Sequence, residues 1–437
     1  MNAYTRAALV IGFVFFGVSG YLHALFSTNL FEPFDILLMD RVPRDSLVQF
    51  DVTYEGAFHL RAFQAVEETG SMHARRCDTA LQIWQSEQNL STAFTFKKSP
   101  SVLQPPSDDM FSVFSTGSVG RGELGALNMG DFSRQSALRA HIFGDLKIPV
   151  NLMFAARFPV TGDWTLGLYL PFYVAQLSDV QWKVRDEDQQ QEAEELLTRI
   201  EETGDMDLRN GWKRKGIGDF TALMTWFHDF IQNKSWLKKV MTGVRGGIIF
   251  PTGLKADTGK IFAFPFGYDG GAGILFGGTL EVDLKHWIWL GVDAQFEHFF
   301  GSKRKRRVMT DTRQTDLVFV NNVSTFKEPG FTQHYTLYVK CAEMWRCISA
   351  LLAYQHTKHQ DDHITFCNSM FSSRIASNAE SMQEWTTHSL VGMLTVDVRD
   401  FNWFAPIPAV SVFAKYGFHG HRALLFDTVG VQMSLDF

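Results

Sequence analysis

The C-terminal stretch constrains the fold of this chain more than any other segment. From Val429 to Phe437, apolar side chains occupy every second position, and Gly, Gln, Ser and Asp occupy the positions between them. Alternation with a period of two indicates a β-strand with one apolar and one polar face. The apolar face continues to the last residue, so it needs either a protein core or lipid against it.

A terminal aromatic residue that closes an alternating strand resembles the sorting signal of bacterial outer-membrane β-barrels. The sequence therefore favours a barrel strand over an edge strand of a soluble sheet. On this interpretation, the barrel-assembly machinery binds the strand that ends at Phe437.

The N-terminal residues 1–26 predict a secretory signal peptide. They combine the positive charge of Arg6, an apolar core from Ala7 to Val18 and the small-residue site Leu22-His23-Ala24. The apolar core is shorter than the roughly 20 residues that a membrane-spanning helix needs. We expect export across the inner membrane, followed by one barrel over residues 27–437.

The composition fits a barrel in the outer membrane of a Gram-negative bacterium. The 437 residues include 40 Phe, 11 Trp and 35 Gly but only 13 Pro, and the mean hydropathy is −0.08. A barrel wall alternates lipid-facing with lumen-facing residues, so its mean hydropathy stays ordinary while its aromatic content rises. The net charge of −6 argues against a nucleic-acid-binding protein.

Fourteen segments have the pattern of strands, and most are longer than the strands of soluble sheets. They are Val48–Ala65, Thr79–Gln85, Ser133–Phe143, Val150–Phe158, Trp164–Leu177, Ile217–Phe230, Leu237–Pro251, Ala272–Lys285, Trp287–Phe300, Phe331–Ala342, Arg346–His356, Thr387–Arg399, Ile407–Gly417 and Ala423–Phe437. Because single-chain barrels of this kind have an even number of strands, we expect an all-β, transmembrane antiparallel barrel of 12–14 strands.

The connections between these segments alternate in length. Short turns fall near Val160–Asp163, Gln232–Ser235, Lys285–His286, Glu343–Met344 and Asp400–Asn402, and long loops at Ser178–Lys215, Thr252–Gly271, Gly301–Gly330 and Thr357–Trp385. With the C-terminus in the periplasm, these short turns are periplasmic and these long loops are external, which is the rule for outer-membrane barrels. Gly144–Pro149 and His419–His421 depart from it as short external connections.

A tryptophan follows each of these turns. These residues are Trp164, Trp236, Trp287, Trp345 and Trp403. Tryptophan prefers the bilayer interface because its ring is apolar while its N–H needs a partner. The sequence thus predicts an aromatic girdle on the periplasmic side.

Charged side chains recur on the face opposite the apolar one. A charge at the lipid midplane costs about 2–4 kcal/mol for Lys or Arg, so these side chains must face the lumen. The predicted lumen-lining residues are Asp219, Lys239, Arg245, Glu281, Asp283, Asp293, Glu297, Lys340, Asp397, Arg399 and Lys415. Both signs are present, so they form either a polar permeation path or a lattice of ion pairs that fills a narrow barrel.

Part of the chain resembles a known family. Gly216-Ile217-Gly218-Asp219, then two strands around a short turn, then Pro251-Thr252-Gly253, is similar to the meta-pathway phenol-degradation family of outer-membrane proteins. The similarity covers Gly216 to Phe437, about half of the chain. It implies a barrel channel related in plan to the long-chain fatty-acid transporters, and uptake of small hydrophobic or aromatic molecules.

Three irregular segments allow more than one interpretation. Residues 86–130, rich in Gly and Ser, either fold into the lumen or form an external loop. The acidic stretch Asp186–Gly204 predicts an exposed external helix, either a lid or a solvated surface. The basic run Ser302–Arg307 has the composition of a nucleic-acid-binding patch, but on an external barrel loop it is expected to contact lipopolysaccharide phosphates instead.

The sequence gives little support for an enzyme. His356, His359 and His363, with Asp361 and Asp362, form the one metal-like cluster, and a hydrated external loop is the simpler interpretation. We expect neither metal nor cofactor. Of the cysteines Cys77, Cys341, Cys347 and Cys367, Cys341 and Cys347 could meet across a hairpin, either bonded or as free thiols.

These observations together predict a passive outer-membrane channel for small molecules, surrounded by outer-membrane lipid and lipopolysaccharide. The alternative is a barrel that conducts nothing and presents long loops as a structural or adhesive surface. An open lumen would favour the channel, and a lumen closed by paired charges would favour the surface protein.

Overall fold

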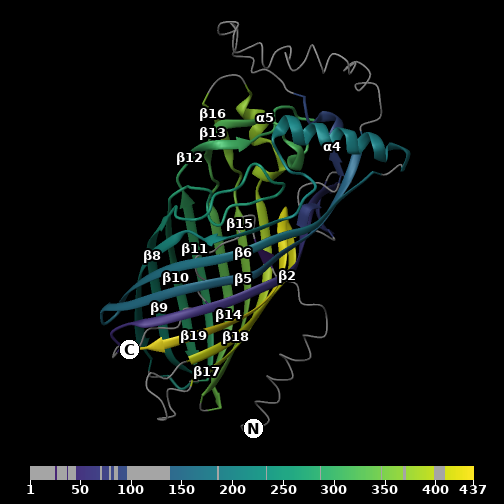
Figure 1. The fold of residues 1–437 in the computed structure, drawn as a ribbon. Coiled ribbons are helices and arrows are strands. Elements are labelled where there is room, and N and C mark those ends of the chain that lie inside the picture. Colours follow the sequence, from purple (N-terminus) through teal and green to yellow (C-terminus); the bar gives the residue numbers. More distant parts are fainter. Residues whose placement is uncertain are drawn as a thin grey trace.

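The computed structural model describes residues 25–26, 37, 46–68, 71–77, 80–82, 87–95, 138–184, 187–232, 234–285, 287–345, 347–367, 371–397 and 409–437. Twelve antiparallel strands form a closed barrel (Figure 1). In chain order they are β2 (Gln49–Glu68), β5 (Arg139–Thr161), β6 (Trp164–Val184), β8 (Phe220–Ile231), β9 (Leu237–Phe250), β10 (Gly273–Leu284), β11 (Ile288–Phe299), β14 (Thr332–Trp345), β15 (Ile348–His359), β17 (Trp385–Asp397), β18 (Ala409–His421) and β19 (Ala423–Asp436).

The predicted all-β barrel is confirmed, with twelve strands. Two of the predicted strand assignments are wrong. The described part of Ser133–Phe143 in the sheet, from Arg139 on, and Val150–Phe158 form the single strand β5, and Gly144–Pro149 lies inside it, where the register with β6 shifts. Proline has no N–H for the ladder, so an irregular stretch accommodates it within a strand. In Thr79–Gln85 the structure describes Ala80–Gln82, which form the 3-10 turn η2 and not a wall strand.

The first and last wall strands close the barrel. β19 pairs with β18 on one side and with β2 on the other, from Ala423↔Phe63 to Asp436↔Gln49. The backbone of Phe437 continues this pairing through hydrogen bonds with Val48 and Leu47. Every strand of the ring therefore has two neighbours, and the ring leaves no free sheet edge.

The alternation in β19 separates the two faces of the wall. Val429 and Val431 are 51% and 41% exposed on the outer face, whereas Gln432 and Ser434 are 5% and 6% exposed on the inner face. The same pattern holds around the ring, where the outward side chains are apolar. They include Leu280, Leu290, Val292, Leu337, Leu352, Leu394 and Val412. This face is suited to lipid.

A band of aromatic and imidazole rings continues the outer face toward the external ends of the strands. The ring of Phe276 contacts that of Phe296, which in turn contacts Tyr335 on the next strand of the wall. Tyr335 stacks on His356 with ring centroids 6.2 Å apart. His356 then contacts His388 at 4.5 Å. Sequence analysis did not predict this band, because its members lie on five different strands or loops.

The remaining elements gather at the end of the barrel opposite the C-terminus (Figure 1). They include a three-stranded sheet of β12 (Ser302–Arg307), β13 (Asn322–Glu328) and β16 (His363–Phe366), and the helices α4 (Gln190–Gly204) and α5 (Ser373–Ser377). β7 (Trp212–Ile217) extends the wall beside β6. Shorter elements are β1 (Leu25–Phe26), β3 (Ser71–Cys77), β4 (Glu87–Asn89), η3 (Leu90–Thr92), η4 (Glu187–Gln189), η5 (Asp316–Val318) and η6 (Glu380–Met382).

The predicted acidic helix is present as α4, but it is more than a solvated surface. Ala193, Leu197 and Ile200 lie on one side of the helix and are buried in an apolar cluster with Leu146 of β5 and Val318 of η5. Its acidic residues occupy the remaining sides. In the described parts of the chain, no helix combines the length and the apolar character that a bilayer crossing requires.

The lipid-facing assignment of the outer wall can be tested with Val292→Arg. Val292 is 47% exposed on the outer face near the middle of β11. We expect a loss of about 2–4 kcal/mol in the free energy of unfolding in lipid, because a cation at midplane depth is poorly solvated. Urea unfolding in liposomes measures it. Glu195→Arg on the exposed side of α4 is the control, and equal losses in both variants would contradict the assignment.

Candidate functional site: the barrel interior and an external cavity

A buried ion pair lies on the inner face of the barrel wall, across the three neighbouring strands β9, β10 and β11. Arg245 of β9 donates two hydrogen bonds, each 2.6 Å, to the two carboxylate oxygens of Asp293 on β11. Thr279 of the intervening strand β10 and Gln295 accept further hydrogen bonds from the guanidinium. The Arg245 and Asp293 side chains are 2% and 3% exposed. Such a bidentate, fully hydrogen-bonded pair is the arrangement in which buried charges are tolerated.

The network continues from Gln295 to a loop residue. The Gln295 amide donates to Glu297 over 2.8 Å, and the hydroxyl of Tyr268 donates to the other carboxylate oxygen of Glu297 over 2.5 Å. His334 of β14 lies 3.7 Å from Glu297. Glu297 is fully buried. The lumen at this level is therefore closed by paired polar side chains.

A second buried pair joins the strands at the closure of the barrel. Arg157 of β5 donates to both carboxylate oxygens of Asp51 on β2, at 2.7 and 2.9 Å, and Ser434 of β19 donates to the same carboxylate. Sequence analysis missed this set. The alternation of Asp51, Thr53 and Glu55 with apolar neighbours was a usable signal for inward-facing residues.

The predicted lumen residues differ in where they lie. Arg245, Asp283, Asp293 and Glu297 are buried on the inner face. Five others lie on the inner face but are only partly buried, namely Lys239, Glu281, Lys340, Asp397 and Lys415. Glu281 accepts a 2.7 Å hydrogen bond from Tyr338, and Lys239 lies 3.6 Å from Asp229. Arg399 is outside the described residues.

Asp219 has a different position from the other nine predicted lumen residues that the structure describes. It lies between β7 and β8, where the wall strand is interrupted, and its carboxylate accepts hydrogen bonds from the backbone N–H groups of Gly253 and Tyr268. Gly267 packs directly against this carboxylate with φ +138°, a conformation that favours glycine. Asp219 therefore fixes the loop between β9 and β10.

This loop, residues 251–272, folds inward over the barrel. Phe266 contacts the ring of Tyr173 on β6, and Tyr268 stacks on Phe299 of β11 while its hydroxyl reaches Glu297. Sequence analysis considered only residues 86–130 as a segment within the lumen. Of that segment the structure describes residues 87–95, where β4 pairs with the external part of β5.

Three of the predicted girdle tryptophans are exposed at the turns. Trp164, Trp236 and Trp287 are 44%, 54% and 38% exposed. Trp345 is the last residue of β14 and pairs with Ile348, so it precedes its turn rather than following it. Trp403 lies outside the described residues. Cys341 and Cys347 are free thiols.

The histidine-rich loop forms a structural cluster. His359 accepts or donates a 2.7 Å hydrogen bond with the hydroxyl of Thr332 through Nδ1, and its Nε2 lies 3.0 Å from Asp362. Lys327 of β13 pairs with Asp362 at 2.6 Å. Thr332 is 1% exposed, so its hydroxyl is not accessible as a nucleophile. Across the described residues, no group of three or more His, Cys, Asp and Glu is arranged to hold a metal ion.

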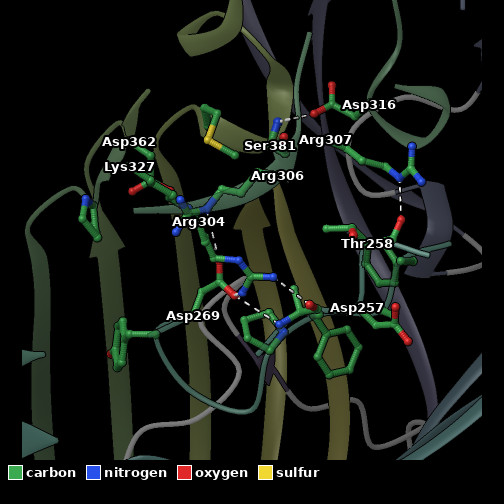
Figure 2. Close-up of a pocket in the computed structure, with 18 of the residues that line it drawn as sticks. Asp257, Thr258, Asp269, Arg304, Arg306, Arg307, Asp316, Lys327, Asp362 and Ser381 are labelled. Carbon is green, nitrogen blue, oxygen red and sulfur yellow. Dashed lines mark hydrogen bonds and ion pairs between the residues drawn. The ribbon is translucent and has the colours of Figure 1, made fainter. Parts of the chain in front are cut away.

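A cavity of about 300 Å³ lies above the lumen among the external elements (Figure 2). Its apolar lining includes Phe262, Phe264 and Trp385, and Tyr268 contributes to it from the loop that reaches Glu297. The cavity has the size and mixed lining of a small-molecule site. Tyr268 thus separates the external cavity from the polar network of the lumen.

The basic run on β12 supplies much of the polar lining. Arg304 and Arg306 both pair with Asp269, as Figure 2 shows, and Arg307 donates to backbone oxygens of neighbouring loops. Only Lys303 and Lys305 of the run are exposed. The predicted contact with lipopolysaccharide phosphates is therefore confined to these two lysines, because the arginines hold the external loops together.

Two carboxyl groups of the external region have shifted pKa values. Burial raises the pKa of Asp316 to about 6, although the N–H groups of Glu380 and Ser381 donate to its carboxylate. Burial alone would also raise the pKa of Asp362, but the Lys327 and His359 side chains hold it well below its usual range.

A closed antiparallel ring with an apolar outer face, a polar interior and long loops at one end defines the class of transmembrane β-barrel found in bacterial outer membranes. No family model and no curated protein matches this chain. Solved structures do. An outer membrane channel from Pseudomonas putida F1 aligns with TM-score 0.46 and 8% identity over 91% of this chain and 100% of that one.

Two further structures align over similar shares of both chains, with lower TM-scores. The CymD monoaromatic hydrocarbon channel has TM-score 0.31 and 10% identity over 90% of this chain and 89% of its own. A FadL homologue from Pseudomonas aeruginosa has TM-score 0.29 and 10% identity over 90% of this chain and 89% of its own. The fold assignment rests on the strand pairing of the present chain.

The buried pair in the lumen can be tested with Arg245→Met. We expect the free energy of unfolding to fall by about 3–5 kcal/mol, because the variant leaves the Asp293 carboxylate buried without its partner. Tryptophan fluorescence during urea unfolding measures it. The exposed pair of Arg139 and Glu87 is the control, and Arg139→Gln should cost at most about 1 kcal/mol. Equal costs would show that the lumen pair is solvated.

The Asp316 carboxyl makes the external loops sensitive to pH. Its pKa in the folded protein, about 6, exceeds the unfolded value of about 3.9. Its stabilising contribution is therefore complete below about pH 4 and is lost as the pH rises through about 6. Hydrogen exchange of residues 371–384, corrected for intrinsic rates, should show more frequent opening at pH 7.5 than at pH 5. Asp316→Asn should remove this difference, and an unchanged difference would assign it to another group.

Proposed function

We propose that the protein is a gated outer-membrane channel through which small apolar or aromatic molecules enter the cell. The observation that carries this proposal is the position of Tyr268. One side of this residue lines an external cavity with aromatic walls, and its hydroxyl donates to Glu297 in the closed network of the lumen. A solute in the cavity therefore lies one side chain away from the barrel interior.

The closed lumen argues against a wide, water-filled pore. Arg245, Asp293, Gln295 and Glu297 are each less than 10% exposed at one level of the barrel. Passage at this level requires Tyr268 and its loop to move away from Glu297. The hinge for such a movement is available at Gly267 and Gly270, both of which have positive φ. Gating then depends on a loop rather than on the rigid wall.

The second candidate function is a non-conducting surface barrel. The buried pairs of Arg245 with Asp293 and of Arg157 with Asp51 favour it, because they tie neighbouring strands of the wall together as a purely structural barrel would require. The external cavity favours the channel, since a structural barrel has no use for a cavity with aromatic walls above its lumen.

The proposed setting follows from the surfaces of the barrel. The signal peptide in residues 1–26 would direct export, and the strand ending at Phe437, which is 53% exposed, would be bound by the assembly machinery. Trp164, Trp236 and Trp287 would lie in the periplasmic interface of the bilayer. Lys303 and Lys305 would face the phosphates of lipopolysaccharide.

Liposome swelling with Tyr268→Ala tests the gate. We expect vesicles with the wild-type protein to swell slowly in phenol and hardly at all in arabinose. Vesicles with the variant should swell several-fold faster in both solutes, because the Tyr268 side chain no longer separates the cavity from the lumen. Tyr268→Phe is the matched control. It keeps the ring on Phe299 but loses the hydrogen bond to Glu297, so an intermediate rate is expected.

The same measurement separates the two candidate functions. If neither the wild-type protein nor Tyr268→Ala conducts phenol or arabinose, although both are folded and heat-modifiable, the channel is ruled out and the surface barrel stands. Stable steps of ionic conductance through the wild-type protein in a planar bilayer would instead contradict the proposal that Tyr268 closes the channel.

A further inference from the structure

The walls of the external cavity divide into an apolar and a cationic part. Phe262, Phe264 and Trp385 supply aromatic rings, and Phe262 and Phe264 meet edge to face with centroids 6.0 Å apart. The cationic part comes from β12 and from Lys260 in the loop of residues 251–272 (Figure 2 shows the arginines). A ligand that fits both parts carries an apolar ring and a charged group.

The arginines of β12 carry more positive charge than their carboxylate partners neutralise. Arg304 and Arg306 share the single carboxylate of Asp269. Arg307 donates to the backbone oxygens of Gly204, Asp205, Thr258, Phe319 and Val320 and, within the described residues, has no carboxylate at ion-pair distance. These three side chains together leave two positive charges without a direct counter-ion.

The remaining carboxylates of the cavity do not remove this excess. Asp362 is paired with Lys327 and hydrogen-bonded to His359. The Asp316 carboxylate accepts hydrogen bonds from the backbone N–H groups of Glu380 and Ser381. Asp257 accepts a hydrogen bond from the N–H of Gly259. Among the described residues that line the cavity, five cationic side chains face four carboxylates, so one positive charge remains in excess.

Lys260 differs from the arginines because its donors are available. It is an exposed residue that lines the cavity, and it forms no ion pair with any residue that the structure describes. The three N–H groups of its ammonium can therefore reorient toward a ligand, whereas the arginine donors are occupied by loop carbonyls. The structure thus supplies a field of positive charge and one free cationic donor beside aromatic walls.

We propose that the external cavity binds a small aromatic carboxylate, with its ring against Phe262, Phe264 and Trp385 and its carboxylate toward Lys260. This inference rests on the proposed function, since it names the substrate class of the cavity above the lumen. A neutral aromatic molecule fills the apolar part equally well but leaves the excess charge without an anion. An inorganic anion meets the charge but leaves the rings uncovered.

Isothermal titration calorimetry on the refolded full-length protein in detergent micelles tests the proposal. Benzoate is the probe, benzyl alcohol is its neutral counterpart, and inorganic phosphate is an anion without a ring. We expect benzoate to bind at least tenfold more tightly than benzyl alcohol, and phosphate to displace it only at a large excess. Lys260→Gln should weaken benzoate binding about tenfold and leave benzyl alcohol unchanged.

A matched variant identifies effects of surface charge alone. Lys305→Gln removes an exposed lysine of β12 that does not line the cavity, and it should leave benzoate binding as it is in the wild-type protein. Phe264→Leu, which keeps an apolar side chain but removes a ring, should weaken benzoate and benzyl alcohol by similar factors.

Three results would overturn the inference. They are equal affinity for benzoate and benzyl alcohol, equal effects of Lys260→Gln and Lys305→Gln, and displacement of benzoate by phosphate at comparable concentration. Liposome swelling in phenol by a protein that does not bind benzoate would leave the proposed channel intact and reject this substrate class. Benzoate binding by a protein whose wild-type and Tyr268→Ala forms do not conduct would support the site and reject the channel.

Discussion

The pairing of β19 with β2 is the constraint on which the rest of the structure depends. Every backbone N–H and C=O in the hydrocarbon layer needs a partner within the protein, and a sheet meets that demand only when its first and last strands join. The register from Ala423↔Phe63 to Asp436↔Gln49 does this. The Arg157–Asp51 pair, with Ser434, then ties three strands at the same seam.

Closure also determines what the interior can contain. A narrow ring points the polar side chain of every second residue into a small volume, where charges are stable only as hydrogen-bonded pairs. Arg245 and Asp293 meet this condition across three strands, and Glu297 meets it with Gln295 and Tyr268. The inner face is therefore lined by paired polar side chains at this level, and Asp219 holds the loop of residues 251–272 against them.

The external elements show how far sequence patterns extend. The alternating strands, the lengths of the loops and the acidic helix were all predictable, because each depends on a local period or composition. The function of Ser302–Arg307 was not predictable in this way. A run of five bases reads as a solvent-facing surface, but strand geometry directs Arg304 and Arg306 toward Asp269 and turns Lys303 and Lys305 to solvent. The partners of these arginines are remote in sequence.

The sequence by itself determined the fold class, the direction of each side chain in strands such as β11 and β19, and the end of the barrel that carries the long loops. These follow from a period of two and from the cost of placing charge in lipid. Only the tertiary structure decided that β5 is one strand, that residues 251–272 reach into the polar network of the lumen, and that a cavity lies beneath β12. Those features depend on contacts between segments far apart in the chain, which no local pattern encodes.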